Sequence, residues 1–261
     1  MSEKETNSEN VVEIKDMHIS FGKNEILKGL DLDLKKQENL VVLGKSGTGK
    51  SVTIKCIVGL LRPDSGSVKV FGNEITSMSK KELDENRKDI GFLFQSGALY
   101  DSMTVRENLE FPLRRIKKEL SEEEIDQKVK EALDNVSLPE AIDKMPSELS
   151  GGMRKRVGLA RTIIVDPKII LYDEPTTGLD PITSDEISQL ILELQTKLKT
   201  SSIIITHDIE CAKTVADRIV MLKDGTVYKT GTLEEFVDDD DEFVSSFFYS
   251  PSQLQKKKQK S

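Results

Sequence analysis

The stretch Gly44-Lys45-Ser46-Gly47-Thr48-Gly49-Lys50-Ser51 decides the fold of this chain. It reads G-x-x-x-x-G-K-S and follows the apolar run Leu40-Val41-Val42-Leu43, which predicts a strand, a glycine loop and a helix in that order. The glycines let backbone N–H groups turn toward anionic oxygens, and the start of the helix adds a positive dipole end. Lys50 has the reach to bind β and γ phosphates, and the Ser51 hydroxyl suits Mg²⁺. The stretch predicts a nucleoside-triphosphate site rather than a glycine-rich surface turn.

Composition and charge place the chain among soluble globular proteins. Its 261 residues suffice for one large domain, and 36% of them are hydrophobic and 32% charged. No apolar run approaches the roughly 18 residues of a membrane-spanning helix, and the polar residues 1–10 carry no secretory signal. The net charge of −8 argues against broad nucleic-acid binding. Cys56 and Cys211 stand in apolar stretches, so we expect buried free thiols and a reducing cytoplasm.

Short β-type runs dominate the chain from residue 11 to about residue 72. They cover residues 11–14, 30–34, 40–43 and 67–71. A helix is predicted from about Lys50 to Leu61, where the turn signal Pro63-Asp64-Ser65-Gly66 follows. Because this helix is rich in β-branched residues, burial rather than local propensity has to hold it.

A change to helical character follows the apolar strand predicted at residues 90–94. Residues 121–136 begin with a capping box of Ser121 and Glu124 and repeat apolar residues at helical spacing. Three apolar β runs at 168–172, 202–206 and 218–222 come later and suit parallel strands covered on both faces. The order predicts a helical insertion between two halves of an α/β core.

The end of the chain after Gly231 joins an acidic run, an apolar cluster and a basic run. We interpret residues 238–242 and the lysines at 256–258 and 260 as solvated tail. The cluster between them either docks on a partner or packs on the chain's own core, and consists of Phe243, Val244, Phe247, Phe248 and Tyr249.

Two carboxylates end the apolar run at 168–172. In a fold with a phosphate loop, Asp173 would hold Mg²⁺, usually through water, and Glu174 would act on the attacking water. An acidic pair on the surface looks the same in isolation. The glycine loop earlier in the chain favours the functional interpretation.

The segment Leu149-Ser150-Gly151-Gly152-Met153 lies between the two motifs. Alone it predicts a helix start with Ser150 as N-cap, or a second anion site where free N–H groups meet a helix N-terminus. Basic residues follow, and we interpret them as a solvated helix face formed by Arg154, Lys155, Arg156 and Arg161.

The ordered motifs resemble those of ABC-transporter ATPase subunits. The resemblance runs from about Val12 to Glu235 and includes GKSGTGKS, FLFQSGALYDSMTVRENL, LSGGMRKRVGLAR, IILYDEP, TTGLDPITS and ITHD. It implies an α/β fold: a P-loop NTPase core with a mostly parallel sheet, an N-terminal antiparallel β subdomain and an inserted α-helical subdomain at about 96–160. The division expected is a disordered tail at 1–10, an ATPase domain at 11–235 and a C-terminal extension at 236–261.

The resemblance also implies roles for single residues. Phe21 matches an aromatic that stacks on adenine, although alone it favours a core position. Gln95 matches a glutamine that contacts the metal and the attacking water, Glu174 the catalytic base, and His207 a histidine that positions the γ-phosphate and water. His18 precedes Phe21 in a strand and is interpreted as structural.

Further matches concern the contact between two subunits. Ser150, Gly151 and Gly152 match residues that cap the γ-phosphate held by the opposite subunit, and Asp180 an aspartate that communicates across the dimer. The implied cofactors are ATP and Mg²⁺. The implied metal ligands are Ser51, Gln95 and Asp173, and the implied nucleotide contacts are Phe21, Gly44, Lys45, Ser46, Gly47, Thr48, Gly49, Lys50, Ser51, Ser150, Gly151, Gly152 and Asp180.

A finer similarity is to the ATPases of Mla-type phospholipid transporters, carried by QSGALYDSMTVRENLEFPL, LSGGM and DEPTTGLDPITS. It implies a homodimer on the cytoplasmic face of the inner membrane, an integral permease and an MCE-domain lipid-binding partner, with no nucleic acid. Three departures stand out: Gln37-Glu38-Asn39 lacks the usual glycine, Met153 replaces a glutamine, and the C-terminal extension matches no clear pattern.

Other classes stay open on the sequence alone. An ATPase for lipoprotein release or small-solute import is the nearest alternative within transporters. A soluble ABC ATPase acting on nucleic acid or the ribosome would usually carry a long coiled-coil insertion or two cassettes. A P-loop kinase would leave LSGGM and TTGLD unexplained.

Overall fold

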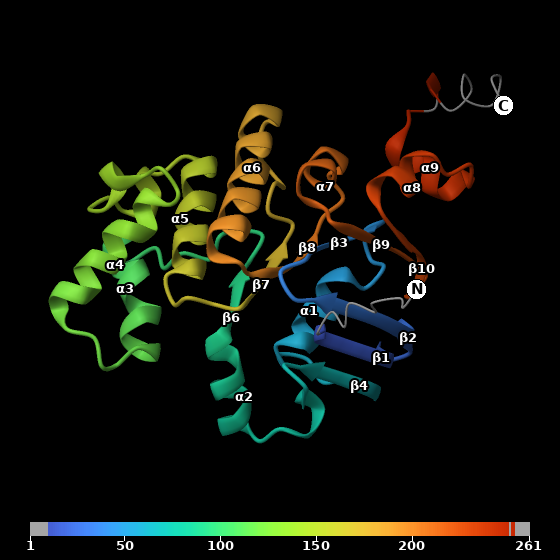
Figure 1. The fold of residues 1–261 in the computed structure, drawn as a ribbon, viewed down its shortest axis with the longest axis horizontal. Helices are drawn as coiled ribbons and strands as arrows, with labels where there is room; N and C mark the ends of the chain where they lie inside the picture. The colour runs from blue at the N-terminus through green and yellow to red at the C-terminus, as the bar shows by residue number, and fades with distance from the viewer. Residues whose placement is uncertain (1–9, 251, 254–261) are drawn as a thin grey trace, which may run out of the picture.

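A six-stranded sheet forms the centre of the chain in the computed structural model, which describes residues 10–250 and 252–253 (Figure 1). Its strand order is β10-β9-β3-β8-β7-β6, and all neighbours are parallel except β10 and β9. The strands are β3 (Asn39–Gly44), β6 (Ile90–Leu93), β7 (Ile169–Asp173), β8 (Ser201–Ile205), β9 (Arg218–Lys223) and β10 (Thr226–Gly231). The predicted α/β class with a mostly parallel sheet is confirmed.

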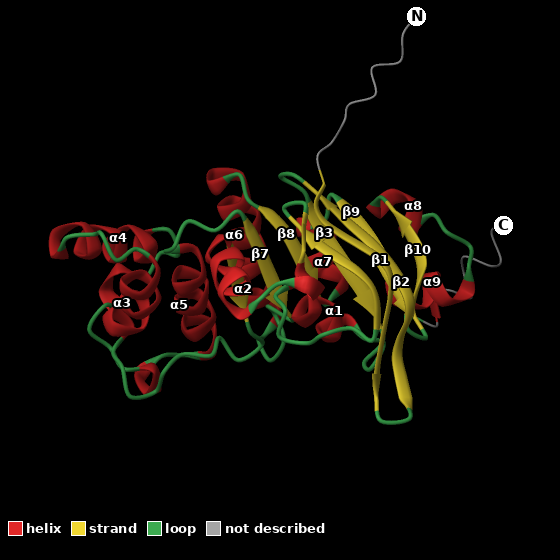
Figure 2. Ribbon diagram, turned by 90° about the horizontal axis from the view of Figure 1, so that it is seen from below, coloured by secondary structure: helices red, strands yellow, loops and turns green. Residues whose placement is uncertain are grey.

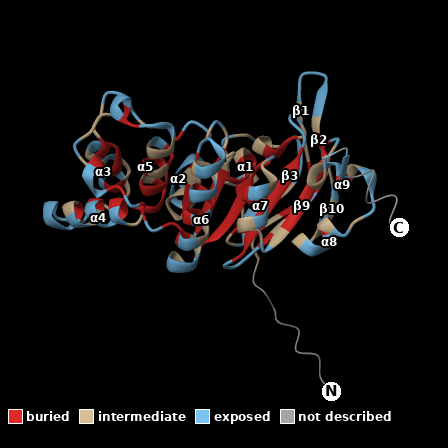
Figure 3. Ribbon diagram, turned by 90° about the horizontal axis from the view of Figure 1, so that it is seen from above, coloured by how far each residue is buried: buried red, intermediate tan, exposed pale blue. Residues whose placement is uncertain are grey.

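Both faces of this sheet are buried, and this explains its continuous apolar runs. Val41 and Leu43 pack into one hydrophobic cluster, whereas Leu40 and Val42 pack into the other. Strands β7 and β8 alternate in the same way. Figure 3 shows the buried residues concentrated along these strands. A parallel sheet covered on both sides needs apolar residues at every position, and the sequence supplies them.

A second sheet covers one face. Its order is β2-β1-β4-β5, with every neighbouring pair antiparallel. Helices α1 and α2 lie between this sheet and the helical part of the chain (Figure 2). These elements are β1 (Asn10–Phe21), β2 (Asn24–Lys35), α1 (Lys50–Ile57), β4 (Ser65–Val70), β5 (Asn73–Glu74) and α2 (Lys80–Asn86).

Helices cover the other face, and α3, α4 and α5 gather at one end of the molecule (Figure 1). Capping boxes fix the starts of α3, at Thr104 and Glu107, and of α4, at Ser121 and Glu124. The amphipathic helix predicted at 121–136 is therefore present. The helices are α3 (Val105–Ile116), α4 (Glu122–Asp134), α5 (Gly151–Ile163), α6 (Pro181–Leu198), α7 (Ile209–Val215), α8 (Leu233–Val237) and α9 (Glu242–Phe248).

Helix α1 ends four residues earlier than the sequence pattern predicts. Its last residue is Ile57 rather than Leu61, because Gly59 adopts a left-handed backbone with φ of +64°. The Gly59 N–H donates to the Cys56 carbonyl at 2.9 Å, and the Leu60 N–H donates to the Lys55 carbonyl at 2.8 Å. This glycine-terminated cap satisfies the last carbonyls and stops the helix before the proline turn.

The end of the chain differs from the solvated tail that we expected. Residues 233–248 fold into α8 and α9, Asp241 caps α9, and Asp239 forms an ion pair with Lys229 of β10. The apolar cluster packs on the chain's own core: Val244 is fully buried, and three phenylalanines lie partly buried against the same cluster. The basic run at 256–260 lies outside the described residues. So do residues 1–9 of the expected tail, whereas Asn10 already belongs to β1.

Phe243 of α9 also reaches toward the phosphate loop. Its ring centroid lies 5.5 Å from Lys45 Nζ and 4.4 Å from Lys223 Nζ. Such distances are those of cation–π contacts. Helix α9 thus touches the strand-to-loop region that the sequence identified first.

Two smaller expectations concern the cysteines and the membrane. Cys56 and Cys211 are both buried free thiols, as predicted, and burial raises the pKa of Cys56 to about 11 and that of Cys211 to about 12. Within residues 10–250 and 252–253, the helices are too short or too polar to cross a membrane.

Phe236 of α8 provides a test of this packing. Its side chain is fully buried, so Phe236→Ala should lower the free energy of unfolding by about 3–5 kcal/mol. Denaturant unfolding followed by circular dichroism measures the loss. Phe111, which is 40% exposed, is the matched control, and Phe111→Ala should cost far less. Equal losses would contradict the packing of α8.

Candidate functional site

One edge of the central sheet gathers the predicted site residues. Strands β3, β6, β7 and β8 are parallel neighbours in space, so their carboxyl ends meet at this edge. A cavity of about 540 Å³ opens there. It is lined by predicted residues from five segments of the chain, including Phe21, Lys50, Ser51, Gln95, Glu174 and His207.

The start of α1 points to a bound anion. Gly49 holds the N-cap position without a side-chain hydrogen bond, and the first turn carries no acidic residue. Each of the other α-helices within residues 10–250 begins with a serine, threonine or aspartate that accepts a hydrogen bond from its first turn. The free N–H groups and the positive end of α1 are left for a ligand such as a phosphate.

The loop before α1 depends on its glycines. Gly49 has a φ of +98°, and a Cβ there would lie 2.4 Å from Leu27 Cδ2. At Gly44 a Cβ would lie 2.8 Å from both the Leu222 carbonyl and Thr48 Oγ1. Loop residues line two cavities, and Ser46 and Gly47 belong to both. Ser46, Gly47, Gly49, Lys50 and Ser51 line the main cavity, and Lys45 and Thr48 line a neighbouring cavity beside Phe243.

Lys50 lies folded onto the loop. Its Nζ donates to the Gly44 carbonyl at 2.7 Å and to the Lys45 carbonyl at 3.1 Å. Burial lowers the pKa of Lys50, and the carboxylates of Glu174 and Asp173 partly oppose that shift. The ammonium group therefore sits within the field of both predicted carboxylates and beside the free start of α1.

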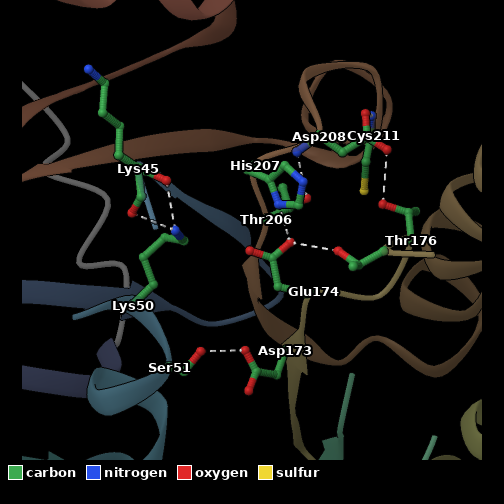
Figure 4. A network of polar contacts seen from close by, with 12 residues as sticks. Lys45, Lys50, Ser51, Asp173, Glu174, Thr176, Thr206, His207, Asp208 and Cys211 are labelled. Atoms are coloured by element: carbon green, nitrogen blue, oxygen red, sulfur yellow. Dashed lines mark hydrogen bonds and ion pairs between the residues drawn. The ribbon is translucent and has the colours of Figure 1, made fainter. Parts of the chain in front are cut away.

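Ser51 and Asp173 form the oxygen pair that suits Mg²⁺. Ser51 Oγ donates to Asp173 Oδ1 at 2.7 Å, so two hard oxygen ligands already face each other (Figure 4). Mg²⁺ commonly binds one or two protein oxygens and completes its shell with phosphate and water. In the described part of the chain, no cluster of three or more His, Cys, Asp and Glu side chains forms a separate metal cage. These observations fit a metal held jointly with a phosphate.

Glu174 is held in an unusual backbone conformation. Its φ is +53°, a left-handed value that costs a non-glycine residue about 1–2 kcal/mol. Its N–H donates to the Ile205 carbonyl at 2.9 Å. On the side chain, Oε2 lies 2.7 Å from His207 Nδ1 (Figure 4). The same oxygen accepts a hydrogen bond from Thr177 Oγ1 at 3.1 Å. The carboxylate is thus aimed into the cavity by two neighbours.

Further contacts hold the loop that carries His207. Thr176 Oγ1 donates to Asp208 Oδ2 at 2.9 Å, and Asp208 caps α7 by accepting from the Glu210 and Cys211 N–H groups. Neither Thr176 nor Thr177 of the TTGLD segment was predicted as a site residue. The available signal was their position close after the carboxylate pair, separated from it only by Pro175.

Phe21 and Gln95 complete the open side of the cavity. Phe21 is 50% exposed at the end of β1, so the core position favoured by its pattern alone is wrong. Gln95 follows β6 and is also exposed at the cavity. A half-exposed ring at the rim of a phosphate cavity is suited to stacking on a flat base.

Four predicted residues lie apart from this cavity. Ser150 caps α5, with Gly151 and Gly152 in its first turn, and Asp180 caps α6. None of the four lines the cavity around Lys50 and Glu174. Hydrogen bonds to Thr183 hold the pKa of Asp180 below its usual value. The structure thus separates the LSGGM segment from the phosphate loop of the same chain.

The basic residues of α5 form only part of the solvated face that we expected, because Arg154 is exposed whereas Lys155 is buried. Lys155 is only 5% exposed, and burial lowers its pKa to about 8. The arginines bind backbone carbonyls: Arg154 those of Pro146 and Leu149, Arg156 that of Val136, and Arg161 those of Gly97 and Ala98. The acceptors of Arg156 and Arg161 come from distant segments, so the local pattern could not reveal them.

The unusual turn before β3 keeps the conformation of a glycine. Gln37 has a φ of +60°, and its N–H donates to Ser201 Oγ at 2.8 Å. Glu38 is held by Arg218, with Nε 2.7 Å from Oε1. The turn therefore forms with Gln37 in the left-handed backbone conformation, although the usual glycine is absent. His18, with its ring between Asp16 and Glu25 at 3.1 and 3.2 Å, lies in β1 and outside the main cavity.

Comparison with known proteins identifies relatives of the whole chain. Residues 27–177 match the family model described as ABC transporter. The chain is 43% identical over 236 residues to the probable ribonucleotide transport ATP-binding protein mkl of Mycobacterium leprae, covering 90% of this chain and 68% of that protein. It is 39% identical over 245 residues to the intermembrane phospholipid transport system ATP-binding protein MlaF of Haemophilus influenzae, covering 94% of this chain and 92% of that protein.

A solved structure agrees with these relatives. The dimeric ATP-binding cassette MJ0796, in a post-hydrolysis state bound to ADP and Pi, superposes with a TM-score of 0.78 and 34% identity, covering 85% of this chain and 98% of that chain. The chain therefore belongs to the ABC transporter family. It is an ATPase of this family, with ATP and Mg²⁺ as its cofactors.

The glycines of the loop allow a matched comparison. Gly47 has a φ of +83° but no atom within 4 Å of a Cβ, whereas Gly49 combines a positive φ with the Leu27 contact. Gly47→Ala should cost about 1–2 kcal/mol of stability through the backbone alone. Gly49→Ala should cost about 1–3 kcal/mol more, through overpacking. Thermal unfolding measures both, and a smaller loss at Gly49 would be inconsistent with the close approach of Leu27.

Proposed function

We propose that the chain is the ATP-hydrolysing subunit of a membrane transporter that moves phospholipids between bacterial membranes. The observation that carries the hydrolysis is the convergence of Lys50, Ser51 and the Glu174–His207 pair in one cavity, with Asp173 hydrogen-bonded to Ser51 beside it. The similarity to MlaF over nearly its whole length supports the phospholipid cargo. The cavity supplies no information on cargo, because it belongs to the nucleotide.

The residues divide the chemistry between them. Lys50 and the free start of α1 bind the triphosphate, and Phe21 stacks on the base. Ser51, Asp173 and Gln95 would hold Mg²⁺, which would supply positive charge against phosphate oxygens when bound. Glu174 orients a water and accepts its proton. Its carboxylate is held in place for this role, because Oε2 lies at hydrogen-bond distance from His207 and Thr177.

Two copies of the chain would complete each site. Ser150, Gly151 and Gly152 lie outside the cavity that contains Lys50, yet Ser150 starts a helix whose positive end suits an anion. Placing this helix start over the phosphate loop of a second copy would close the cavity from above. The cassette MJ0796 is itself dimeric in the solved structure that resembles this chain. ATP affinity for the closed pair would then drive conformational change in a partner.

The partners proposed are an integral permease and an MCE-domain lipid-binding protein, with the ATPase attached at the cytoplasmic face of the inner membrane. The support is the Mla-type pattern of the sequence and the MlaF relative. A second candidate cargo is a ribonucleotide, because the mycobacterial relative at 43% identity bears that name.

Glu174→Gln tests the catalytic assignment. The amide keeps the size and hydrogen bonds of the side chain but accepts no proton, so ATP binding should persist while hydrolysis falls by about 10²–10⁴-fold. Nucleotide binding and phosphate release are measured on the same protein. Glu186→Gln is the control, because Glu186 pairs with Arg156 away from the cavity. Parental turnover in Glu174→Gln would show that another group is the base.

The cargo is tested with the intact complex. The full-length chain is purified with its membrane partner in a mild detergent, and small molecules that accompany it are identified by mass spectrometry. Phospholipid that leaves the complex on addition of Mg·ATP is the expected result. A ribonucleotide dependence without bound lipid would favour the second candidate instead.

A further inference from the structure

Lys155 connects two loops of the nucleotide cavity. It lies on α5, one turn after the helix begins, with only 5% of its surface exposed. Its Nζ donates to the backbone carbonyl of Gln95 and, at 3.2 Å, to the backbone carbonyl of Glu174. These carbonyls belong to the two residues whose side chains enter the cavity from β6 and β7.

The two carbonyls belong to adjacent chain segments. Strands β6 and β7 are paired in parallel, with Leu93 opposite Tyr172, so Gln95 and Glu174 each follow their strand by one or two residues. An ammonium group has three donors on a compact centre and no acceptor, which suits a bridge between carbonyls. Lys155 therefore fixes the distance between the loops after β6 and β7, where Gln95 and Glu174 line the cavity.

The contact matters most for Glu174. Its left-handed backbone has to be held by its surroundings, because the conformation is unfavourable by itself. The Ile205 carbonyl holds the peptide before Glu174, and Lys155 holds the peptide after it. Both peptides flanking the predicted base are thus anchored, which fixes where its carboxylate points.

Helix α5 also holds the Gln95 loop at neighbouring points. Gly158 packs on Gly97 so closely that a Cβ would lie 3.2 Å from the Gly97 Cα, and Arg161 donates to the Gly97 and Ala98 carbonyls. Of the basic residues on α5, Arg154 and Arg156 bind segments away from the cavity and Arg161 binds only the Gln95 side. Lys155 alone among these four reaches both loops.

We propose that Lys155 is a positioning residue for ATP hydrolysis. It holds the Gln95 and Glu174 carbonyls together, so that both side chains enter the cavity in the geometry that the reaction needs. The inference rests on the proposed function, in which Gln95 and Glu174 act on the metal and the attacking water. It also gives α5, the helix that starts at the LSGGM segment, a direct mechanical link to the predicted base.

Lys155→Met tests the proposal in the full-length chain, because methionine fills the space of the lysine stem without donating a hydrogen bond. A shift of the base by about 1 Å can lower a rate by roughly 100-fold, so kcat should fall on that order. KM for ATP should stay within about twofold, since the phosphate loop is untouched. Lys155→Gln, which keeps two donors on a shorter stem, should restore kcat to an intermediate value.

Arg156→Met is the matched control. It removes a cation of the same helix that binds the Val136 carbonyl and Glu186, outside the cavity. Its kcat should equal that of the parent even where its Tm falls. Equal losses of kcat in the Lys155 and Arg156 variants, in step with Tm, would reduce Lys155 to a structural role. A parental kcat in Lys155→Met would overturn the proposal outright.

The outcomes separate the inference from the function on which it rests. If the parent protein does not hydrolyse ATP, the proposed function fails and the inference fails with it. An active parent with an unaffected Lys155→Met variant sinks the inference alone. If Lys155→Met does not fold, Lys155→Gln carries the test: a kcat lowered by at least about threefold at unchanged KM supports the positioning role, and an unchanged kcat refutes it.

Discussion

The parallel pairing of β3, β8, β7 and β6 is the constraint on which the site depends. Parallel strands end at the same edge, so residues as far apart in the chain as Lys50 and His207 meet around one cavity. The pairing is possible only because both faces of the sheet are covered, one by the antiparallel sheet with α1 and the other by helices. Burial of Val41, Leu43 and their neighbours thus fixes where Lys50, Glu174 and His207 lie relative to one another.

Parts of this arrangement were visible in the sequence because their causes are local. The glycine loop, the continuous apolar strands and the capping box of Ser121 and Glu124 each depend on residues a few positions apart, and the structure contains all three. The early end of α1 is also local: it depends on Gly59, whereas the predicted end rested on the proline turn alone. Features that depend on residues a few positions apart can be predicted from sequence, but two local signals close together can place the end of a helix wrongly.

Other parts depend on contacts that no local pattern records. The basic residues of α5 resemble a solvated face until the carbonyls of Gln95, Glu174 and Gly97 are seen beside them. The acidic run near residue 240 resembles a tail until Lys229 and the start of α9 supply partners. A charged side chain is predictable from sequence as a charge, whereas its partner is a property of the fold.

Phe243 of α9, near the end of the described chain, contacts two lysines close to the nucleotide site. The ring faces Lys45 of the phosphate loop and Lys223 of β9, with 5.5 and 4.4 Å between ring centroid and ammonium. An aromatic face attracts a cation without neutralising it, unlike a carboxylate, which would compete with a phosphate for the same lysine. Helix α9 can therefore restrain these two ammonium groups while leaving their full charge available to an incoming nucleotide, and a chain shortened before residue 242 would lose the restraint but keep the charge.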